Sequence, residues 1–466
     1  MSRGEAILYT LVLYKIVLVG IGLWATRRTR DAGDFFLGGR RLGAWVAAIS
    51  ASASSSSAWT LVAVSGMAYL WGWPALWLFP ATVSGFMINW LWVAPRLMRA
   101  SRAQGAITLT EFLAGPEAAN GWPRRIVLLA SAVILFSFTF YVAAQFQAAG
   151  SAFASAFQLE LRTAVGLGAA VVLLYTLLGG FWAVSVTDTL QGLVMALTAL
   201  VLPVAAVVAA GGPGAILSAL AEQGTMTGGP PTAGIAAVGF VLGTLGIGLG
   251  YPGQPHVVNR FMALRDPRAL RDARVIALGW AVIIYAGMLS LGLAARALYG
   301  GLLADEQVLF EVANRLFAPV VAGVMIAAVL SAIMSTADSQ LLVAASSVSH
   351  DLPRRGRGSL AVSRLVVALI SLLAVAVALL LPQTIFARVL FAWTALGAAF
   401  GPPLLVRLAG FELPPERVFA AMAVGFSGTV LFYWASDAPG DWLERLVPFF
   451  ASLAICVVSA RRERPA

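Results

Sequence analysis

Cysteine and histidine are almost absent from this chain. Its 466 residues include one cysteine, Cys456, and two histidines, His256 and His350. A single cysteine excludes an intramolecular disulfide framework and a cysteine-based metal site. The sequence also has no P-loop, no dinucleotide-binding fingerprint and no metal-ligand spacing, so ATP-driven pumping and redox chemistry have no support. We therefore do not expect an enzyme, and we expect the two histidines to contact terminal carbonyls at cytoplasmic helix ends.

Charged residues are also scarce, and apolar residues dominate. Only 11% of the residues are charged and 60% are hydrophobic, with a mean hydropathy of +0.87. Apolar runs repeatedly reach about 20 residues, which is the length that an α-helix needs to cross a bilayer. These runs predict an all-α, polytopic membrane protein of about 13 transmembrane helices in a single transmembrane transporter domain, residues 1–466. The predicted helices span residues 6–26, 42–71, 74–97, 126–155, 163–182, 187–211, 233–254, 275–299, 318–349, 361–382, 385–406, 418–435 and 445–460.

The basic residues indicate how the chain is oriented in the membrane. The formal net charge is +10, but the arginines lie in short loops between the predicted spans, which favours a role in orientation over a nucleic-acid partner. By the positive-inside rule these loops are cytoplasmic, so we expect the N-terminus outside and the C-terminus in the cytoplasm. The first apolar run ends at Arg27 and Arg28 without a small-residue cleavage site, which indicates a retained span. The basic clusters lie at residues 27–30, 40–41, 96–102, 124–125, 260–274, 354–357 and 461–464.

A polar stretch interrupts the apolar run at residues 318–348. Its residues Ala332, Ser335, Thr336 and Ser339 follow the i, i+3, i+4, i+7 spacing and share one helix face. A carbonyl and two hydroxyls on that face are hard oxygen donors, which bind small cations such as sodium. The alternative is that these small residues only allow close helix packing.

Two carboxylates lie near this polar face. Asp338 belongs to the same stretch, and because a carboxylate is costly in lipid we expect it to face water, a second cation or an arginine. A second cation would also use Ser339 and Asp188, whereas a protonated carboxyl would favour proton coupling. Asp188 is predicted at the cytoplasmic start of the span 187–211, as a helix N-cap, as a waypoint on the ion route, or as both.

Two of the predicted spans are expected to be broken. Residues 50–57 form a serine-rich run inside the span 42–71, and glycines precede the segment Tyr251–Pro255 in the span 233–254. Serine side chains compete for helical hydrogen bonds, and the prolines of the second segment remove backbone donors. Interrupted spans at matching positions of two halves are typical of the binding site of an inverted-repeat transporter. Close helix packing is the alternative explanation of the glycines.

The two breaks divide the chain into two five-helix units. We expect a first repeat over residues 42–211 and a second over 233–406, with a peripheral first helix and loop at 1–41 and peripheral C-terminal helices at 407–466. The solute is expected to bind between the broken spans, near polar and aromatic side chains. The candidates are Ser57, Trp59, Tyr141, Gln145, Tyr251, Gln254 and Pro255. For the aromatic ones, a place at the membrane interface is the alternative.

Several motifs make the chain resemble the solute:sodium symporter family, and within it the bacterial sodium/proline symporters. The motifs are Asp34–Arg40 (DFFLGGR), Gly180–Gln191, Gly250–His256 (GYPGQPH) with Arg260–Met262, and Ser335–Leu342 (STADSQLL). The resemblance implies a leucine-transporter-type five-plus-five inverted repeat in a bacterial inner (plasma) membrane. It also implies a sodium site built from the backbone carbonyls of Ala53, Ser56 and Ala332 and the hydroxyls of Ser335 and Thr336. Asp188 matches the aspartate on the inner sodium route of the family.

Two positions depart from the sodium/proline symporters. Those proteins carry an aspartate where Ser55 stands and a tryptophan where Ile247 stands, and Asp338 is the expected substitute for the missing carboxylate. We predict a symporter that imports a small organic solute, with proline or a related amino acid as the first candidate, driven by sodium through alternating access. The alternatives are a proton-coupled carrier of another small organic solute and a transporter-like solute sensor, although no output domain follows Arg464.

Overall fold

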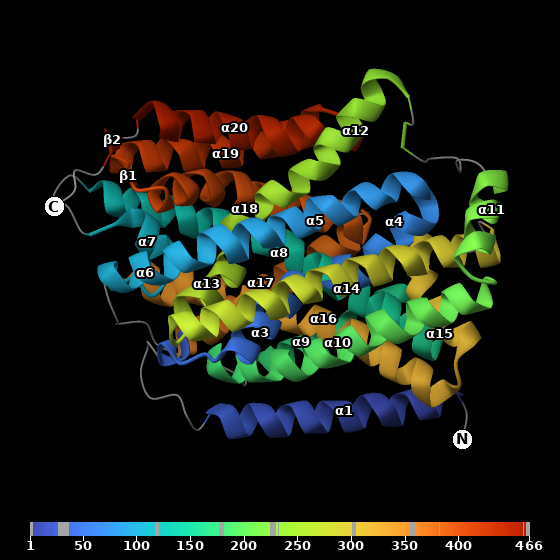
Figure 1. The fold of residues 1–466 in the computed structure, drawn as a ribbon. Coiled ribbons are helices and arrows are strands. Elements are labelled where there is room, and N and C mark those ends of the chain that lie inside the picture. Colours follow the sequence, from blue (N-terminus) through green and yellow to red (C-terminus); the bar gives the residue numbers. More distant parts are fainter. Residues whose placement is uncertain are drawn as a thin grey trace.

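Figure 1 shows the computed structural model, a bundle in which the long helices run nearly parallel. The structure describes residues 3–26, 37–116, 121–176, 181–223, 230–231, 233–300, 304–353, 360–381, 383–459 and 461–462. Parts of the sequence motifs and basic clusters lie outside these residues, namely 27–30, 34–36, Gly180, 354–357 and Arg464.

The elements follow one another along the chain with short connections. The N-terminal half contains α1 (Arg3–Thr26), η1 (Gly38–Arg40), α3 (Ala44–Ser55), η2 (Trp59–Ala63), α4 (Val64–Trp71), η3 (Trp73–Trp77), α5 (Leu78–Met87), η4 (Ile88–Val93), α6 (Ala94–Gln104), α7 (Leu109–Ala114), α8 (Trp122–Phe157), α9 (Leu161–Thr176), α10 (Phe181–Ala209) and α11 (Pro213–Gln223). The C-terminal half contains α12 (Gly234–Gly246), η5 (Ile247–Gly253), α13 (Pro255–Ala263), α14 (Pro267–Tyr299), η6 (Asp305–Gln307), α15 (Val308–Leu316), α16 (Pro319–Ser346), η7 (Ser347–Asp351), α17 (Leu360–Leu380), α18 (Ile385–Leu408), β1 (Phe411–Glu412), α19 (Pro415–Ala435), η8 (Pro439–Asp441), α20 (Trp442–Ser459) and β2 (Arg461–Arg462). The two short strands pair with each other antiparallel.

The predicted all-α, membrane-spanning architecture is confirmed, but the count of about 13 spans is not. Within the described part of the chain, 9 helices are long and apolar enough to cross a membrane. Three of the other predicted spans contain only shorter apolar helices, at Ile7–Leu18, Trp59–Trp71 and Leu161–Leu173. The second of these is short because a helix break interrupts its span.

The first predicted break is present in the structure. Helix α3 ends at Ser55, and Ser56 leaves the helix with φ −95° and ψ 68°. The Ser55 hydroxyl donates to the carbonyl of Ser52 at 3.0 Å, which shows the local competition expected of a serine run. The chain then continues as the π-helix η2 and as α4.

The second predicted break is also present. A 3₁₀ helix, η5, follows α12, and Gln254 then adopts φ −92° and ψ 100° before α13 begins at Pro255. A residue that precedes proline is disfavoured in the helical region, so Gln254 ends one helix and Pro255 starts the next. Helix α13 was not predicted, because the expected span ended at residue 254.

The two broken helices meet at one end of the bundle. Backbone hydrogen bonds join Leu42, just before α3, to Ala263, the last residue of α13, at 3.1 Å and to Arg265, just after it, at 3.0 Å. The Arg40 guanidinium adds contacts to the carbonyls of Ala106 at 2.6 Å and Met262 at 3.4 Å. The start of the first broken helix and the end of the second are therefore tied together at this end.

The bundle has two peripheral faces and two distinct ends. Helix α1 lies along one face beside α10 and α16, whereas α19 and α20 lie on the opposite face beside α18 (Figure 1). The chain termini lie at opposite ends of the bundle (Figure 1). We call these the N-end, which carries α11 and α15, and the C-end, which carries α6, α7 and α13.

Candidate functional site

The hydroxyls of α16 face the end of α3. Ser335 Oγ lies 3.3 Å from the carbonyl oxygen of Ala53 and 3.2 Å from that of Ala332. Thr336 Oγ1 lies 3.0 Å from the carbonyl oxygen of Ser54. The last carbonyls of a helix have no intrahelical partner, so the end of α3 leaves oxygens for another ligand. Carbonyl and hydroxyl oxygens from two helices thus meet at one fully buried place.

Ser56 is the remaining predicted sodium ligand and lies at the same helix end. Its hydroxyl accepts a hydrogen bond from Trp280 Nε1 at 3.1 Å. Its backbone has left the helical conformation, because Ser56 is the C-cap residue of α3. The structure therefore brings Ala53, Ala332 and Ser335 into contact and sets Thr336 against the adjacent carbonyl. The role of these residues as sodium ligands stays a prediction.

A narrow cavity lies beside the first helix break. It has room for about one water molecule, so its walls must separate before a solute binds. Its lining includes the predicted solute residues Trp59, Tyr141 and Tyr251, and no lining residue is charged. The lining residues are Ser55, Trp59, Tyr141, Ile247, Tyr251, Tyr285, Val389, Leu390 and Trp393.

Hydroxyl groups link the walls of this cavity. Tyr251 and Tyr285 share a hydrogen bond of 3.0 Å between their hydroxyls, and Tyr285 lies 3.2 Å from Thr60 Oγ1. On the other side, the Tyr141 hydroxyl donates to Ser57 Oγ at 3.4 Å. The cavity is thus aromatic in its faces and polar at its edges.

Gln145 and Gln254 serve the two helix breaks. Gln145 Oε1 accepts from the backbone N–H of Ala58 at 3.1 Å, and Gln254 Nε2 donates to the carbonyls of Gly250 at 3.0 Å and Trp393 at 2.9 Å. Their other amide atoms are buried without a hydrogen-bond partner among the described residues. Each glutamine therefore holds a break and keeps one polar atom for another ligand.

Trp59 also carries an unpaired polar atom. Its ring lines the cavity, and its indole Nε1 is buried with no hydrogen-bond partner in the described part of the chain. A buried donor of this kind is costly unless a ligand accepts its hydrogen bond. The roles of Trp59, Gln145, Gln254 and the other four candidates in solute binding stay predictions.

Phe386, at the start of α18, packs against the cavity residue Trp59. Its ring stacks on Trp59 with 5.6 Å between centroids and meets Trp71 edge-on at 5.3 Å. Its backbone N–H donates to Glu306 Oε1 at 3.2 Å, which joins η6 to α18. Burial raises the pKa of Glu306 to about 7, against the stabilisation that the Phe386 N–H gives to the charged form.

A buried ion pair joins α13 to α10. Arg260 Nη2 of α13 lies 3.1 Å from Asp188 Oδ2 of α10, and the two side chains are 1% and 0% exposed. Ser50 Oγ of α3 donates to the same carboxylate oxygen at 2.7 Å, and Arg260 Nη2 donates to Ser339 Oγ of α16 at 2.5 Å. Ser339 follows Ser335 by one helical turn, so Arg260 contacts α16 about one turn from the predicted sodium ligands.

The prediction that Asp188 caps a helix is wrong. Helix α10 begins at Phe181, so Asp188 lies about two turns inside it. Its Oδ1 atom is buried without a hydrogen-bond partner among the described residues, which leaves one carboxylate oxygen for a passing cation. A place on the ion route stays a prediction for this residue.

Asp338 faces a different helix. It is fully buried on α16, and Thr176 Oγ1 of α9 donates to its Oδ1. The adjacent Ser339 instead accepts from Arg260. A second cation shared by Asp188, Asp338 and Ser339 stays a prediction, and it would compete with Arg260 for two of these groups.

The two histidines lie in different surroundings. His256 lies in the first turn of α13, fully buried, with its ring edge-on to Phe138 at 5.5 Å and Tyr141 at 6.1 Å. His350 contacts the Glu111 carboxylate at 2.9 Å. The predicted contacts of the two histidines with terminal carbonyls stay predictions, and His256 lies at the start of α13 rather than at the end of the expected span.

Sequence reasoning missed several residues of the site. It placed Arg260 in a loop, and it named neither Tyr285 nor Trp393, which lie in uninterrupted apolar stretches. The proline at position 255 was a usable signal, because proline often opens a helix and would have put Arg260 on it. Nothing local distinguishes Trp393, whose Nε1 donates to the carbonyl of Ile247 at 3.1 Å.

The comparison with known families is decisive at this point. The model of the sodium:solute symporter family matches residues 35–412. The chain belongs to this family. Among relatives, the osmoregulated proline transporter OpuE of Bacillus subtilis is 34% identical, over 99% of this chain and 96% of that protein. The high-affinity proline transporter PutP of the same organism is 35% identical, over 96% of each chain. The sodium/proline symporter of Escherichia coli is 32% identical, over 100% of this chain and 95% of that protein.

Two solved structures of distant sequence share the fold. A Na⁺-coupled sialic acid symporter in a substrate-bound outward-open state matches with a TM-score of 0.79 and 17% identity, over 99% of this chain and 100% of that chain. MhsT in complex with L-phenylalanine matches with a TM-score of 0.54 and 14% identity, over 90% and 97%. These likenesses confirm the predicted fold class of this sodium:solute symporter family member.

Proposed function

We propose that this chain is a secondary active symporter that imports proline or a related amino acid, driven by the sodium gradient through alternating access. Its relatives in Bacillus subtilis and Escherichia coli are named proline transporters or sodium/proline symporters. The observation that carries the proposal is the shared use of one broken helix. The end of α3 supplies carbonyls to the oxygen cluster with α16, and the residues around the same break line the cavity.

This arrangement couples the ion to the solute. A cation held by the carbonyls of Ala53 and Ser56 fixes the end of α3, and the cavity residues Ser55 and Trp59 lie at the same break. A ligand drives a conformational change only if it binds one state more tightly than the other. Sodium would bind more tightly to the state in which the break is ordered. One cation crossing a potential of 100 mV contributes about 2.3 kcal/mol before any concentration gradient.

Once its walls separate, the lining of the cavity suits a small zwitterion with an apolar body. Its aromatic faces suit a compact hydrocarbon ring, and it offers no full charge to a cationic or anionic solute. The end of α3 presents carbonyl oxygens to an ammonium group, and Trp59 Nε1 is a donor for a carboxylate. Sodium/proline symporters carry a tryptophan at the position of Ile247. In this chain Trp393 of α18 places an aromatic ring beside Ile247 instead.

Two sets of contacts serve as gates in this proposal. Phe386 with Glu306 closes the outer side, and the Asp188–Arg260 pair closes the inner side. The basic C-end is then cytoplasmic by the positive-inside rule, so the C-terminus is inside and the N-terminus outside a bacterial plasma membrane. The repeats are residues 42–211 and 233–406, flanked by the peripheral helices at 1–41 and 407–466.

Uptake into proteoliposomes tests this function. We expect labelled proline to accumulate when an inward sodium gradient is imposed, and not when choline replaces sodium. A panel of related amino acids should show competition by those that retain a small apolar body. If accumulation follows a proton gradient instead, the carrier is proton-coupled. If proline binds but shows no sodium-dependent counterflow, the chain is a sensor and the transport proposal fails.

Trp59→Phe is expected to weaken solute binding. The change keeps a ring that can stack on Phe386 but removes the indole Nε1 donor, and a hydrogen bond to a charged group is worth about 1.5–3 kcal/mol. We therefore expect the apparent proline affinity to fall about tenfold or more. Trp71→Phe is the matched control, because Trp71 also contacts Phe386 but does not line the cavity. Equal affinities of the Trp59 variant and the parent would show that Nε1 does not contact the solute.

A further inference from the structure

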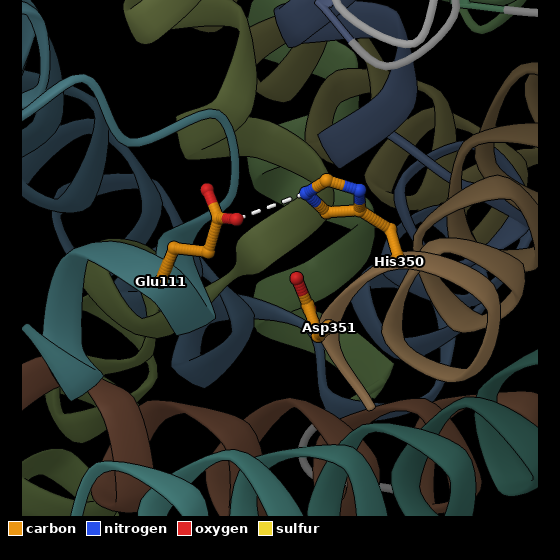
Figure 2. Close-up of side chains that lie close together, drawn as sticks. All are labelled: Glu111, His350 and Asp351. Carbon is orange, nitrogen blue, oxygen red and sulfur yellow. Dashed lines mark hydrogen bonds and ion pairs between the residues drawn. The ribbon is translucent and has the colours of Figure 1, made fainter. Parts of the chain in front are cut away.

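Three side chains that the transport site does not use meet at the C-end of the bundle. Glu111 belongs to the short helix α7, and His350 and Asp351 belong to η7, at the end of α16. Figure 2 shows the three side chains pointing toward one another across the gap between these elements. His350 Nε2 lies 2.9 Å from Glu111 Oε1, and one donor atom from each residue lies within 4.8 Å of the other two.

Neighbouring groups hold these side chains in position. The Thr108 hydroxyl accepts from the backbone N–H of Glu111 at 3.1 Å as the N-cap of α7, and donates to Asp351 Oδ1 at 2.9 Å. Glu111 Oε2 accepts from the backbone N–H of Ile107 at 2.8 Å. In protein metal sites, hydrogen bonds of this kind orient the side chains that bind the metal.

The cluster has the donor atoms and the access that a cation site needs. Two carboxyl groups and one imidazole lie together there. The side chains of His350 and Glu111 are 10% and 30% exposed, so water reaches the cluster from one side.

We propose that Glu111, His350 and Asp351 form a binding site for a divalent transition-metal ion, with zinc as the probe. One imidazole nitrogen and two carboxylate oxygens are a donor set that zinc accepts, and water completes its coordination. The imidazole distinguishes such an ion from calcium and magnesium, which prefer oxygen ligands alone. The competing interpretation is a plain ion pair between His350 and Glu111, which binds no metal.

A metal ion here would join α7 to the inner end of α16. Helix α16 also carries Ser335 and Thr336, and its inner end must move if the C-end opens during transport. Bound zinc would therefore hold the closed arrangement and slow uptake. This effect rests on the proposed function, whereas the binding site itself does not.

The chain is well suited to a direct zinc titration. It has two histidines and one cysteine, and both His256 and Cys456 are fully buried. Background binding by soft ligands should therefore be small, provided that the purified full-length protein carries no polyhistidine tag. We expect calorimetry with zinc chloride in detergent to show one site per chain, and the same titration with magnesium chloride to show none.

Single substitutions assign the site. His350→Gln, Glu111→Gln and Asp351→Asn should each weaken zinc binding at least about tenfold, since even loss of a supporting group costs about 10–100-fold in metal affinity. Glu311→Gln is the matched control, because Glu311 is an exposed glutamate that pairs with Arg315 on α15. Zinc affinity of the parent that survives in His350→Gln would overturn the proposal.

A spectroscopic measurement on the parent needs no variant and no transport. Zinc X-ray absorption should show nitrogen and oxygen ligands without sulfur. A sulfur ligand would assign binding to Cys456, and no saturable binding would leave the plain ion pair; either result overturns the proposal. If zinc binds as expected but does not slow sodium-driven uptake, the gating effect fails while the site stands.

Discussion

Arg260→Gln is expected to abolish sodium-driven uptake. The substitution removes the partner of Asp188, and breaking a buried ion pair from one side typically costs about 3–5 kcal/mol because the remaining charge has no compensation. It also removes the donor to Ser339, so α3, α10 and α16 lose their common partner at the C-end. The closed inner side should become the less stable one, and the transport cycle should stall.

Cysteine labelling measures this change independently of uptake. In a Cys456→Ser background, a cysteine at Ser346, which is buried near the inner end of α16, should react faster with a water-soluble maleimide in the Arg260→Gln variant. Arg260→Lys is the conservative control: it keeps the charge but loses the planar fork that reaches several acceptors, so an intermediate effect is expected. Labelling at the parental rate in Arg260→Gln would contradict a gating role.

A double variant distinguishes the coupling between Asp188 and Arg260 from the separate effect of each residue. Asp188→Asn with Arg260→Gln removes both charges, so no buried charge is left unpaired and stability should recover in part relative to either single change. Uptake should not recover, since Asp188 is also the proposed waypoint for sodium. If the double variant is no more stable than Arg260→Gln alone, the two groups are not energetically coupled and the ion pair does not hold the inner side.

The features that sequence predicted correctly rest on local chemistry. The serine run at residues 50–57 and the prolines at 252 and 255 disturb helical hydrogen bonding within a few residues, so both breaks could be placed without knowing the fold. The polar face of α16 follows from helical spacing alone, and the structure sets its hydroxyls against the end of α3.

The features that sequence missed depend on contacts between distant segments. Arg260 lies 72 positions after Asp188 in the chain, and the sequence around either residue gives no signal that the two form a pair. Trp393 and Tyr285 lie in apolar stretches, where an aromatic side chain in a site cannot be distinguished from one in the packed core. The short helices α7, α11 and α15 were also missed, because a helix of this length gives too little periodicity to stand out from a loop.

Ser335→Ala and Thr336→Ala are each expected to lower the apparent sodium affinity about tenfold or more, with a smaller effect on the maximal rate. Each change removes one hydroxyl oxygen from the cluster at the end of α3, and a polar contact to a charged group is worth about 1.5–3 kcal/mol. In a site without a carboxylate ligand, each remaining dipole carries a larger share of the attraction that offsets dehydration of the ion. Saturating sodium should restore most of the uptake rate, because the alternating-access machinery itself is unchanged.

Ser339→Ala and Thr336→Ser make this test specific to the ion site. Ser339 lies one turn further along α16 and contacts Arg260, so its loss should change the sodium affinity less than either ligand substitution. Thr336→Ser keeps the hydroxyl and should remain close to the parent. Sodium titrations of proline uptake, together with calorimetry in detergent, give the affinities. If both alanine variants bind sodium as the parent does, the cation does not lie between α3 and α16. The proposed coupling of sodium to the solute through the break at the end of α3 then fails as well.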